Sequence, residues 1–487
     1  MTGSLRDRSF VAVRWSALSM LGKAIIAFLQ LMLLARILTP AQIGLLALTL
    51  TVTNTAQMIS DIGISNALIH FSDQTENELR SLYWLNLLTG FIITVIVALL
   101  SEPIAAFYRA PEIVPLLLLA SIYFVVWASA QQFRVLAERD LDISTLAKIE
   151  LLSFFLGFCI TISLAHRLGP MAVVLGFIAN AVINSGLVWV FLRKNFSFAP
   201  RLRFNEVSRY VLYGVKILLT NVVNTFSLQS DVIVVGRVFG SSTLGLYSQP
   251  REFGLRIMFV INPIITRVAF PLMAKAKDDR GHIQRIYHKT LRMTASINFP
   301  IYFFIAVFAE DVTAIVLGPQ WQQAAGLMRL FAIWCAFRSV GNPSSSLLFS
   351  TGHTTRALMS ATLVMLSLFG LAWIGSSFSH EAVIYLMIGF YIFLIPAFWA
   401  GLVRPVCGSS FWNYHKQVII PAVCASCAAV VAFFATRYLD PGFIRLGVGG
   451  SVGGLVYLAS SYIINREWLD EMVEFALKRK RRRGDAS

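Results

Sequence analysis

Long apolar segments recur along the whole chain and are separated by short polar stretches. Each is long enough for one helix to cross about 30 Å of hydrocarbon, which takes about 20 apolar residues. The fourteen expected spans lie near residues 10–36, 41–69, 82–101, 113–133, 146–166, 169–192, 210–236, 242–273, 294–309, 323–350, 355–377, 382–403, 417–436 and 442–464. The pattern therefore predicts an all-α integral membrane protein with about fourteen transmembrane helices.

An internal repeat links the two halves of the chain. The segment A-R-I-L-T-P-A-Q-I-G-L-L, which contains Arg36 and Gly44, returns as G-R-V-F-G-S-S-T-L-G-L-Y with Arg237 and Gly245 at the same spacing and an offset of 201 residues. Each copy follows one apolar run and leads into another, as expected of a duplicated membrane protein. The same offset carries the first span onto the seventh, so we expect two pseudo-symmetric six-helix lobes.

The predicted domains follow from this repeat. They are an N-terminal lobe at 1–208, a C-terminal lobe at 209–406, and a region at 407–487 that holds helices 13 and 14 and a basic tail. No connection is long enough to form a soluble domain. The tail after residue 465 is predicted to be an interfacial helix that ends in a polybasic patch at 478–483.

Basic residues crowd alternate connections between the spans. The crowded set comprises Arg134, Arg139, Lys148, Arg193, Lys194, Arg201, Arg203, Arg209, Lys275, Lys277, Arg280, Arg285, Lys289 and Arg292. The positive-inside rule places these connections, and both termini, in the cytoplasm. Because both termini are expected on the same side of the membrane, the number of spans must be even, and fourteen meets this requirement. The net charge of +16 is thereby explained by topology, and we expect no nucleic-acid partner.

Composition excludes a soluble protein, because 57% of the residues are hydrophobic and only 14% are charged, against about 25% charged in soluble domains. The five cysteines form no disulfide framework, and the seven histidines have no metal-ligand spacing. No phosphate-binding loop of the form GxxxxGK[ST] is present. We therefore predict no catalytic residue, metal or cofactor, and a protein that is not an enzyme.

Ionisable and amide side chains inside the expected spans are the candidate functional residues, because charge at membrane depth is costly and usually serves a pathway or a partner. The predicted substrate-binding set is Lys23, Asn54, Gln57, Lys216, Asn221, Asn224, Arg256, Arg267 and Arg338. The predicted ion-coupling carboxylates are Asp61 and Asp231. The spacing of Asn54, Gln57 and Asp61 places the three on one helical face.

Two interpretations of these residues compete. In one, they line a net-positive, water-filled cavity between the lobes, whose cations attract a diphosphate or carboxylate in a low dielectric. In the other, they form local pairs, such as Arg251 with Glu252, or extend towards the headgroups, as Arg329 and Arg338 could. The second interpretation is weaker for four residues, which would need buried partners: Lys23, Asp61, Lys216 and Asp231.

Several segments resemble one known family. They are S-D-I-G-I-S-N-A-L-I at 60–69, L-Y-W-L-N at 82–86, Q-Q-F-R-V-L-A-E-R-D-L-D at 131–142, N-P-I-I-T-R-V-A-F-P-L-M-A-K at 262–275, G-P-Q-W at 318–321 and R-S-V-G-N-P-S-S-S-L-L at 338–348. Together they resemble the polysaccharide transporters, or Wzx-type flippases, of the multidrug/oligosaccharidyl-lipid/polysaccharide exporter superfamily, with the colanic-acid exporter branch nearest.

The resemblance implies alternating-access translocation of undecaprenyl-diphosphate-linked repeat units to the periplasmic leaflet, for exopolysaccharide or lipopolysaccharide biosynthesis. The implied partners are that lipid-linked glycan, membrane lipids, and a polymerase with other assembly proteins. Lys23, Asp61, Lys216, Asp231, Arg267 and Arg338 lie in or beside the family-like segments. The role of Lys216 rests on its depth alone.

Two alternatives stay open. A small-molecule or drug antiporter on the same fold would favour carboxylates and aromatic side chains, because its substrates are often cations. A membrane-bound glycan polymerase or acyltransferase would need catalytic groups, and polymerases of this kind carry a large periplasmic loop, whereas the outer connections here are short.

Overall fold

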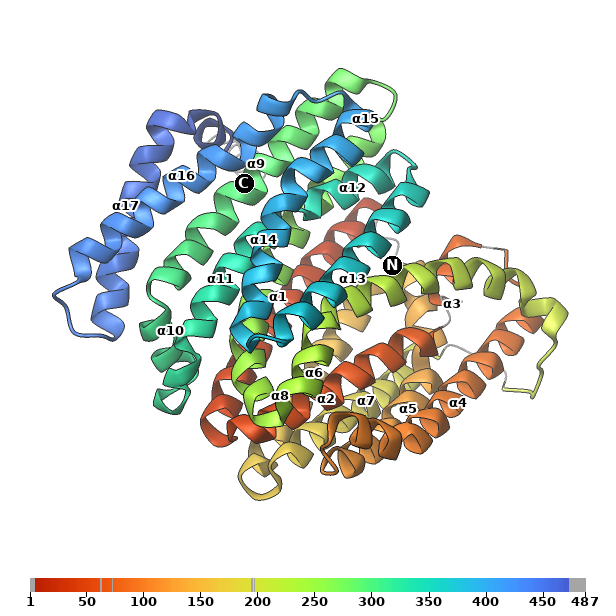
Figure 1. The fold of residues 1–487 in the computed structure, drawn as a ribbon. Coiled ribbons are helices and arrows are strands. Elements are labelled where there is room, and N and C mark those ends of the chain that lie inside the picture. The colour runs from red at the N-terminus through yellow and green to blue at the C-terminus, as the bar shows by residue number, and fades with distance from the viewer. Residues whose placement is uncertain (1–4, 62–63, 72, 194–195, 197, 473–487) are drawn as a thin grey trace. The chain divides into compact units, whose positions relative to one another are not determined.

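The computed structural model describes residues 5–61, 64–71, 73–193, 196 and 198–472, and within them the side chains of 5–13, Asn66, Ile69, His70 and Lys216 are outside the description. All regular structure in these ranges is helical (Figure 1). The first half of the chain forms α1 (Leu5–Ile37), α2 (Pro40–Ser60), α3 (Ile64–His70), α4 (Glu76–Tyr108), α5 (Ile113–Arg139), α6 (Ile143–Leu168), α7 (Pro170–Leu192) and α8 (Phe204–Lys275).

The second half continues with α9 (Arg280–Val307), α10 (Ala309–Val316), a 3₁₀ turn (Pro319–Ala324), α11 (Ala325–Val340), α12 (Asn342–Ser350), α13 (Thr354–Ser376), α14 (His380–Phe398), a π-helical turn (Trp399–Val403), α15 (Arg404–Cys407), α16 (Phe411–Thr436) and α17 (Phe443–Ile464). Residues 466–472 are also helical.

Thirteen helical segments of the described chain are long and apolar enough to cross a membrane. One of them, α8, has 72 residues and is interrupted at Gly240, whose φ of 78° and ψ of 179° lie outside the helical region. A positive φ is readily adopted by glycine, which has no Cβ. The two arms of α8 match the expected spans 210–236 and 242–273, so the segments provide the fourteen predicted crossings and the all-α membrane fold is confirmed.

Local chemistry explains where the helices begin. Thr39 and Gln42 form a reciprocal capping box at the start of α2, and Thr75 and Glu78 form another at the start of α4. Each box satisfies backbone N–H groups that a helix start leaves unpaired, which matters near a membrane. Asp279 caps α9 by accepting from the N–H groups of Gly281 and His282.

Two expected spans are interrupted. The span predicted at 41–69 ends as a helix at Ser60, and Asp61 then accepts from the N–H and hydroxyl of Ser65 in α3. The span predicted at 323–350 changes from α11 to α12 at Gly341, just before Pro343. Proline has no backbone N–H and its ring crowds the carbonyl four residues earlier, here Ser339, so a break just before Pro343 is expected.

The chain divides into two compact units, residues 1–249 with 361–370, and residues 250–360 with 371–487. In unit 1, α4, α5 and α7 pack side by side, and α1 packs on α6. In unit 2, α9 packs on α11, α16 and α17 (Figure 1). The domain boundaries that the sequence repeat predicts stay a prediction; these domains are 1–208, 209–406 and 407–487.

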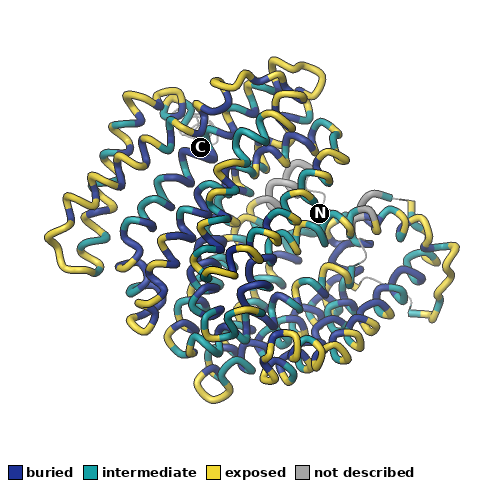
Figure 2. The backbone as a smooth tube through the Cα atoms, in the orientation of Figure 1, coloured by how far each residue is buried: buried dark blue, intermediate teal, exposed yellow. Residues whose placement is uncertain are grey.

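Large apolar side chains are exposed along the helices, as a lipid-facing surface requires. On α16 and α17 they include Ile419, Val423, Val430, Phe434, Leu455, Leu458 and Tyr462 (Figure 2). Residues 466–472 are fixed to α9, because Arg292 forms ion pairs with Glu467 and Glu471. The polybasic patch predicted at 478–483 lies outside the described residues.

The two copies of the sequence repeat contact each other within unit 1. A Cβ added to Gly44 in α2 would lie 1.8 Å from the carbonyl oxygen of Ser241, and one added to Gly245 would lie 1.8 Å from that of Pro40. The offset of 201 residues converts Pro40 into Ser241 and Gly44 into Gly245, so the two contacts are equivalent. Glycine is required here because backbone meets backbone.

Replacing either repeat glycine is expected to separate the two helices. Gly44→Ala and Gly245→Ala should each lower the free energy of unfolding by about 1–3 kcal/mol, the usual cost of overpacking. Gly186→Ala is the matched control, since nothing lies within 4 Å of a Cβ at that helical position. Thermal melting of the purified variants in detergent measures the effect, and equal melting temperatures for all three variants would contradict the close crossing.

Candidate functional site

Lys23 forms an ion pair inside the helix bundle of unit 1. Its Nζ lies 2.6 Å from Oε2 of Glu150, and the pair joins α1 to α6. Both side chains are half-buried. Lys23 therefore has the partner that its depth requires. Glu150 was not predicted as a site residue, although it is the one acidic residue in the expected span 146–166 and the same depth argument applies to it.

Asp61 begins a chain of hydrogen bonds across unit 1. The Ser65 hydroxyl donates to Oδ1 of Asp61 over 2.6 Å, and Nε2 of Gln131 donates to the Ser65 oxygen over 2.8 Å. Arg134 Nη1 then donates to Oε1 of Gln131 over 3.3 Å. The carboxylate is thus linked through α3 to the C-terminal part of α5.

Arg134 corrects the sequence-based assignment, which placed it among the basic residues of a cytoplasmic connection. Its side chain is only 5% exposed. Its Nε donates to Oδ1 of Asn184 over 2.8 Å, its Nη2 donates to the Ser185 hydroxyl over 2.9 Å, and its guanidinium lies 3.6 Å from the ring centre of Trp127. Neutral polar groups and an aromatic face therefore solvate the buried charge.

The other candidates on α2 have different environments. Nε2 of Gln57 donates to the Tyr123 hydroxyl over 2.6 Å, whereas Asn54 is exposed. The Tyr123 ring stacks on Trp127 and on Phe177, with centroids 5.5 Å and 4.2 Å away. Asp61 keeps helical dihedrals beyond the last residue of α2, which leaves it in register with Gln57.

The candidates on the first arm of α8 do not form one cluster. Asn221 is partly buried and Asn224 is exposed, while the side chain of Lys216 lies outside the described residues. Asp231 is 1% exposed and accepts from the Tyr247 hydroxyl over 3.1 Å. That bond joins the two arms of α8 across the bend at Gly240.

In unit 2, two arginines surround one tryptophan. The guanidinium carbons of Arg338 and Arg251 lie 5.0 Å and 5.9 Å from the Trp334 ring centre. Arg338 also donates to the Tyr391 hydroxyl, and Arg251 pairs with Glu252 over 3.2 Å. The expected Arg251–Glu252 pair is present, but Trp334 and Tyr391 were not predicted.

The unit 2 cluster brings guanidinium groups together. Arg256 follows Arg251 on the same arm of α8, is partly buried and interacts electrostatically with Glu252. Arg267 is exposed and lies further along the arm, and Nδ2 of Asn298 donates to Oδ1 of Asn262 over 3.0 Å nearby. Guanidinium groups in an apolar helix bundle are suited to phosphate oxygens, which they bind in a bidentate manner.

Thirteen apolar helical segments of the described chain, one of them (α8) divided into two arms, together with an internal repeat and charged groups solvated inside the bundle, define a polytopic membrane protein with the architecture of a transporter. The family model described as "Polysaccharide biosynthesis protein" matches residues 33–326, which is more than half of the chain. The chain belongs to that family, which confirms the resemblance to polysaccharide transporters.

Individual relatives match most of the length of this chain. The lipopolysaccharide biosynthesis protein WzxC of Escherichia coli (strain K12) is 28% identical over 444 residues, 88% of each chain. The teichuronic acid biosynthesis protein TuaB of Bacillus subtilis (strain 168) is 29% identical over 464 residues, 93% of this chain and 95% of TuaB. Among solved structures, the lipid II flippase MurJ in its inward closed conformation shares the fold, with a TM-score of 0.74, 13% identity and coverage of 93% of this chain and 99% of MurJ.

A double-mutant cycle distinguishes a structural Lys23–Glu150 pair from a substrate-binding lysine. Glu150→Gln and Lys23→Met should each destabilise the protein, because each leaves one charge unpaired in a low dielectric. The double variant should recover most of that loss, with a coupling energy of about 0.5–3 kcal/mol in thermal or denaturant unfolding.

The same variants are then tested for function. A double variant as stable as the wild type that exports polysaccharide normally would remove Lys23 from the substrate-binding set. A stable double variant without export would support its role there. Additive losses of stability would contradict the ion pair itself.

Proposed function

We propose that this protein is a flippase that moves undecaprenyl-diphosphate-linked oligosaccharide repeat units from the cytoplasmic to the periplasmic leaflet of the bacterial inner membrane. The product would serve exopolysaccharide or lipopolysaccharide biosynthesis. The names of WzxC and TuaB refer to the biosynthesis of surface polymers, and MurJ is titled a lipid II flippase. These relationships support a lipid-linked glycan as the substrate.

The observation that carries the proposal is the group of guanidinium side chains around Trp334 in unit 2. Arg251 and Arg338 lie over this ring, and Arg256 adds a third guanidinium group on the same arm of α8 as Arg251. Within apolar spans guanidinium groups attract an anion far more strongly than in water. The two phosphates of a diphosphate offer oxygens that guanidinium groups bind in a bidentate manner.

The mechanism we propose is alternating access. Basic residues bind the diphosphate while the prenyl chain stays in the bilayer, and a change of conformation then presents the glycan to the periplasm. The step breaks no covalent bond and needs no catalytic residue, because the ligand only has to bind two conformations differently. Lys23, Asn54, Gln57, Lys216, Asn221, Asn224, Arg256, Arg267 and Arg338 remain the proposed substrate-binding set.

Asp61 and Asp231 are the proposed ion-coupling carboxylates. Acidic groups at membrane depth serve as proton relays in many transporters. The hydrogen-bonded chain from Asp61 through Ser65 and Gln131 to Arg134 supports such a role, since protonation of the carboxylate would alter each bond along it. The termini are proposed to be cytoplasmic, and a polymerase and other assembly proteins to receive the product.

Loss of a substrate-binding cation should stop export without stopping folding. Arg338→Ala and Lys216→Ala are each expected to lower export about tenfold or more, as the loss of a charge-assisted hydrogen bond of about 1.5–3 kcal/mol implies. Surface polysaccharide and intracellular lipid-linked repeat units are measured in a strain that lacks the chromosomal gene, and the latter should accumulate.

Arg329→Ala is the matched control on the same helix, because Arg329 forms a half-exposed ion pair with Glu310. Tyr391→Phe removes only the hydroxyl that Arg338 contacts and should retain export. Normal export from both Arg338→Ala and Lys216→Ala would return these residues to local structural roles and remove the main support for the proposal.

A further inference from the structure

A pocket lies in unit 1 where α4 begins and where α5 and α7 end, and the proposed transport step does not use it. Its volume is about 270 Å³. Its apolar walls are Leu79, Leu136, Ala137, Leu192 and Phe196. Its charged residues are Arg80, Arg139, Arg193, Glu76 and Asp140. The pocket is therefore amphiphilic, with an apolar lining and three guanidinium groups.

The apolar lining rests on a rigid aromatic cluster. Phe196 packs on Tyr83 and on Phe133, with ring centroids 5.4 Å and 5.3 Å apart. Trp189 stacks on Phe198 at 4.9 Å with the two rings almost parallel. A wall built on stacked rings has few alternative arrangements. The packing of these rings therefore fixes the shape of the apolar wall of the pocket.

The three arginines have partners that an anion can replace. Arg80 pairs with Glu76 over 3.1 Å, but the Glu76 side chain is 87% exposed, so water weakens the pair. Arg139 lies 3.3 Å from Asp140 and donates to Oε1 of Gln74 over 2.6 Å. Arg193 is exposed and stacks on Phe198 at 5.6 Å. With two carboxylates against three guanidinium groups, the pocket has a positive excess.

We propose that this pocket binds the phosphodiester headgroup of an anionic phospholipid of the cytoplasmic leaflet. Guanidinium groups bind phosphate oxygens in a bidentate manner. The pocket lies at the ends of three membrane-spanning helices, on the side that the positive-inside rule assigns to the cytoplasm. Basic pockets between helices on that side are suited to anionic headgroups. The apolar walls accept the glycerol and the first acyl methylenes, which a free phosphate ion would leave unmatched.

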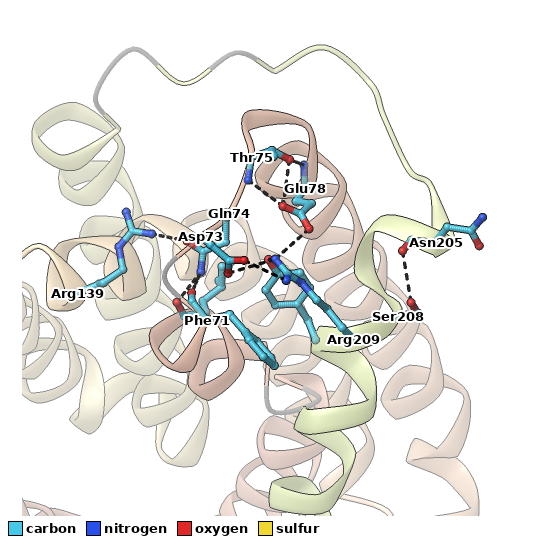
Figure 3. Close-up of polar contacts among 11 residues, drawn as sticks. Phe71, Asp73, Gln74, Thr75, Glu78, Arg139, Asn205, Ser208 and Arg209 are labelled. Atoms are coloured by element: carbon cyan, nitrogen blue, oxygen red, sulfur yellow. Dashed lines mark hydrogen bonds and ion pairs between the residues drawn. The ribbon is translucent and has the colours of Figure 1, made fainter.

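The headgroup would also affect a neighbouring connection. Arg139 holds Gln74 on one side of the segment 73–78, and Arg209 of α8 holds the other side through Asp73 over 3.4 Å and Glu78 over 3.1 Å (Figure 3). The segment joins α3 to α4. A phosphate that draws the Arg139 guanidinium away from Gln74 would release one of these two attachments. The lipid composition would then affect how firmly the segment 73–78 is held.

The test measures lipid binding by the purified full-length protein and does not depend on export. Native mass spectrometry and thermal melting compare phosphatidylglycerol with phosphatidylcholine in mixed micelles. The wild type should retain phosphatidylglycerol and melt at a higher temperature with it than with phosphatidylcholine. Arg193→Glu and Arg80→Gln/Arg193→Gln should weaken that binding about tenfold or more, in line with the loss of charge-assisted bonds.

Arg167→Gln/Arg437→Gln is the matched control, since both arginines are exposed and lie at the ends of other helices. Equal phosphatidylglycerol binding by the wild type and the pocket variants would overturn the proposal. Inorganic phosphate at millimolar concentration forms a separate arm, and stabilisation by phosphate equal to that by the lipid would replace the headgroup with a free ion. Arg193→Glu keeps the test decisive if the double variant is unstable, because Arg193 is a surface residue.

Discussion

A charge in the hydrocarbon layer must be solvated by the protein, and this requirement organises the interior of both units. Lys23 meets it with the carboxylate of Glu150. Arg134 meets it with amide, hydroxyl and indole groups from α5 and α7. Because an unpaired ion in a low dielectric costs several kcal/mol, loss of either contact would leave a costly charge between α1 and α6 or between α5 and α7.

The two units solve this problem differently. In unit 1 the half-buried Lys23 pairs with a carboxylate and the buried Arg134 bonds to neutral polar groups. In unit 2 the Trp334 ring lies against the guanidinium groups of Arg338 and Arg251, Arg338 also lies over the Tyr391 ring, and Arg251 pairs with Glu252. The sequence repeat does not carry the carboxylate of Asp61 from one half to the other: 201 residues after Asp61 stands Asn262, which pairs with another amide, Asn298. The turn with Arg36 and Gly44 is repeated at Arg237 and Gly245, whereas this candidate site residue is not.

Hydropathy predicts the helical crossings well because each span depends only on about 20 consecutive residues. The break between α11 and α12 can be predicted in the same way, because it depends only on the nearby Pro343. Partners are harder to predict: Lys23 and Glu150 are 127 residues apart, and no local pattern connects them. Arg134 was misplaced because a count of basic residues near a span end does not reveal which way a side chain points. Its burial depends on Asn184 and Ser185, which come from another helix.

The crossing at Gly44 and Gly245 bears on how the chain originated. Gly44 contacts Ser241, and Gly245 contacts Pro40. Each copy of the repeat therefore presents the same two positions to the other copy. Reciprocal contact of this kind defines an isologous interface, in which identical surfaces face one another across a two-fold axis. A single copy of the repeat could therefore have made the same crossing with another molecule of itself. At this corner the chain makes with itself a two-fold crossing of the kind by which two identical subunits pair.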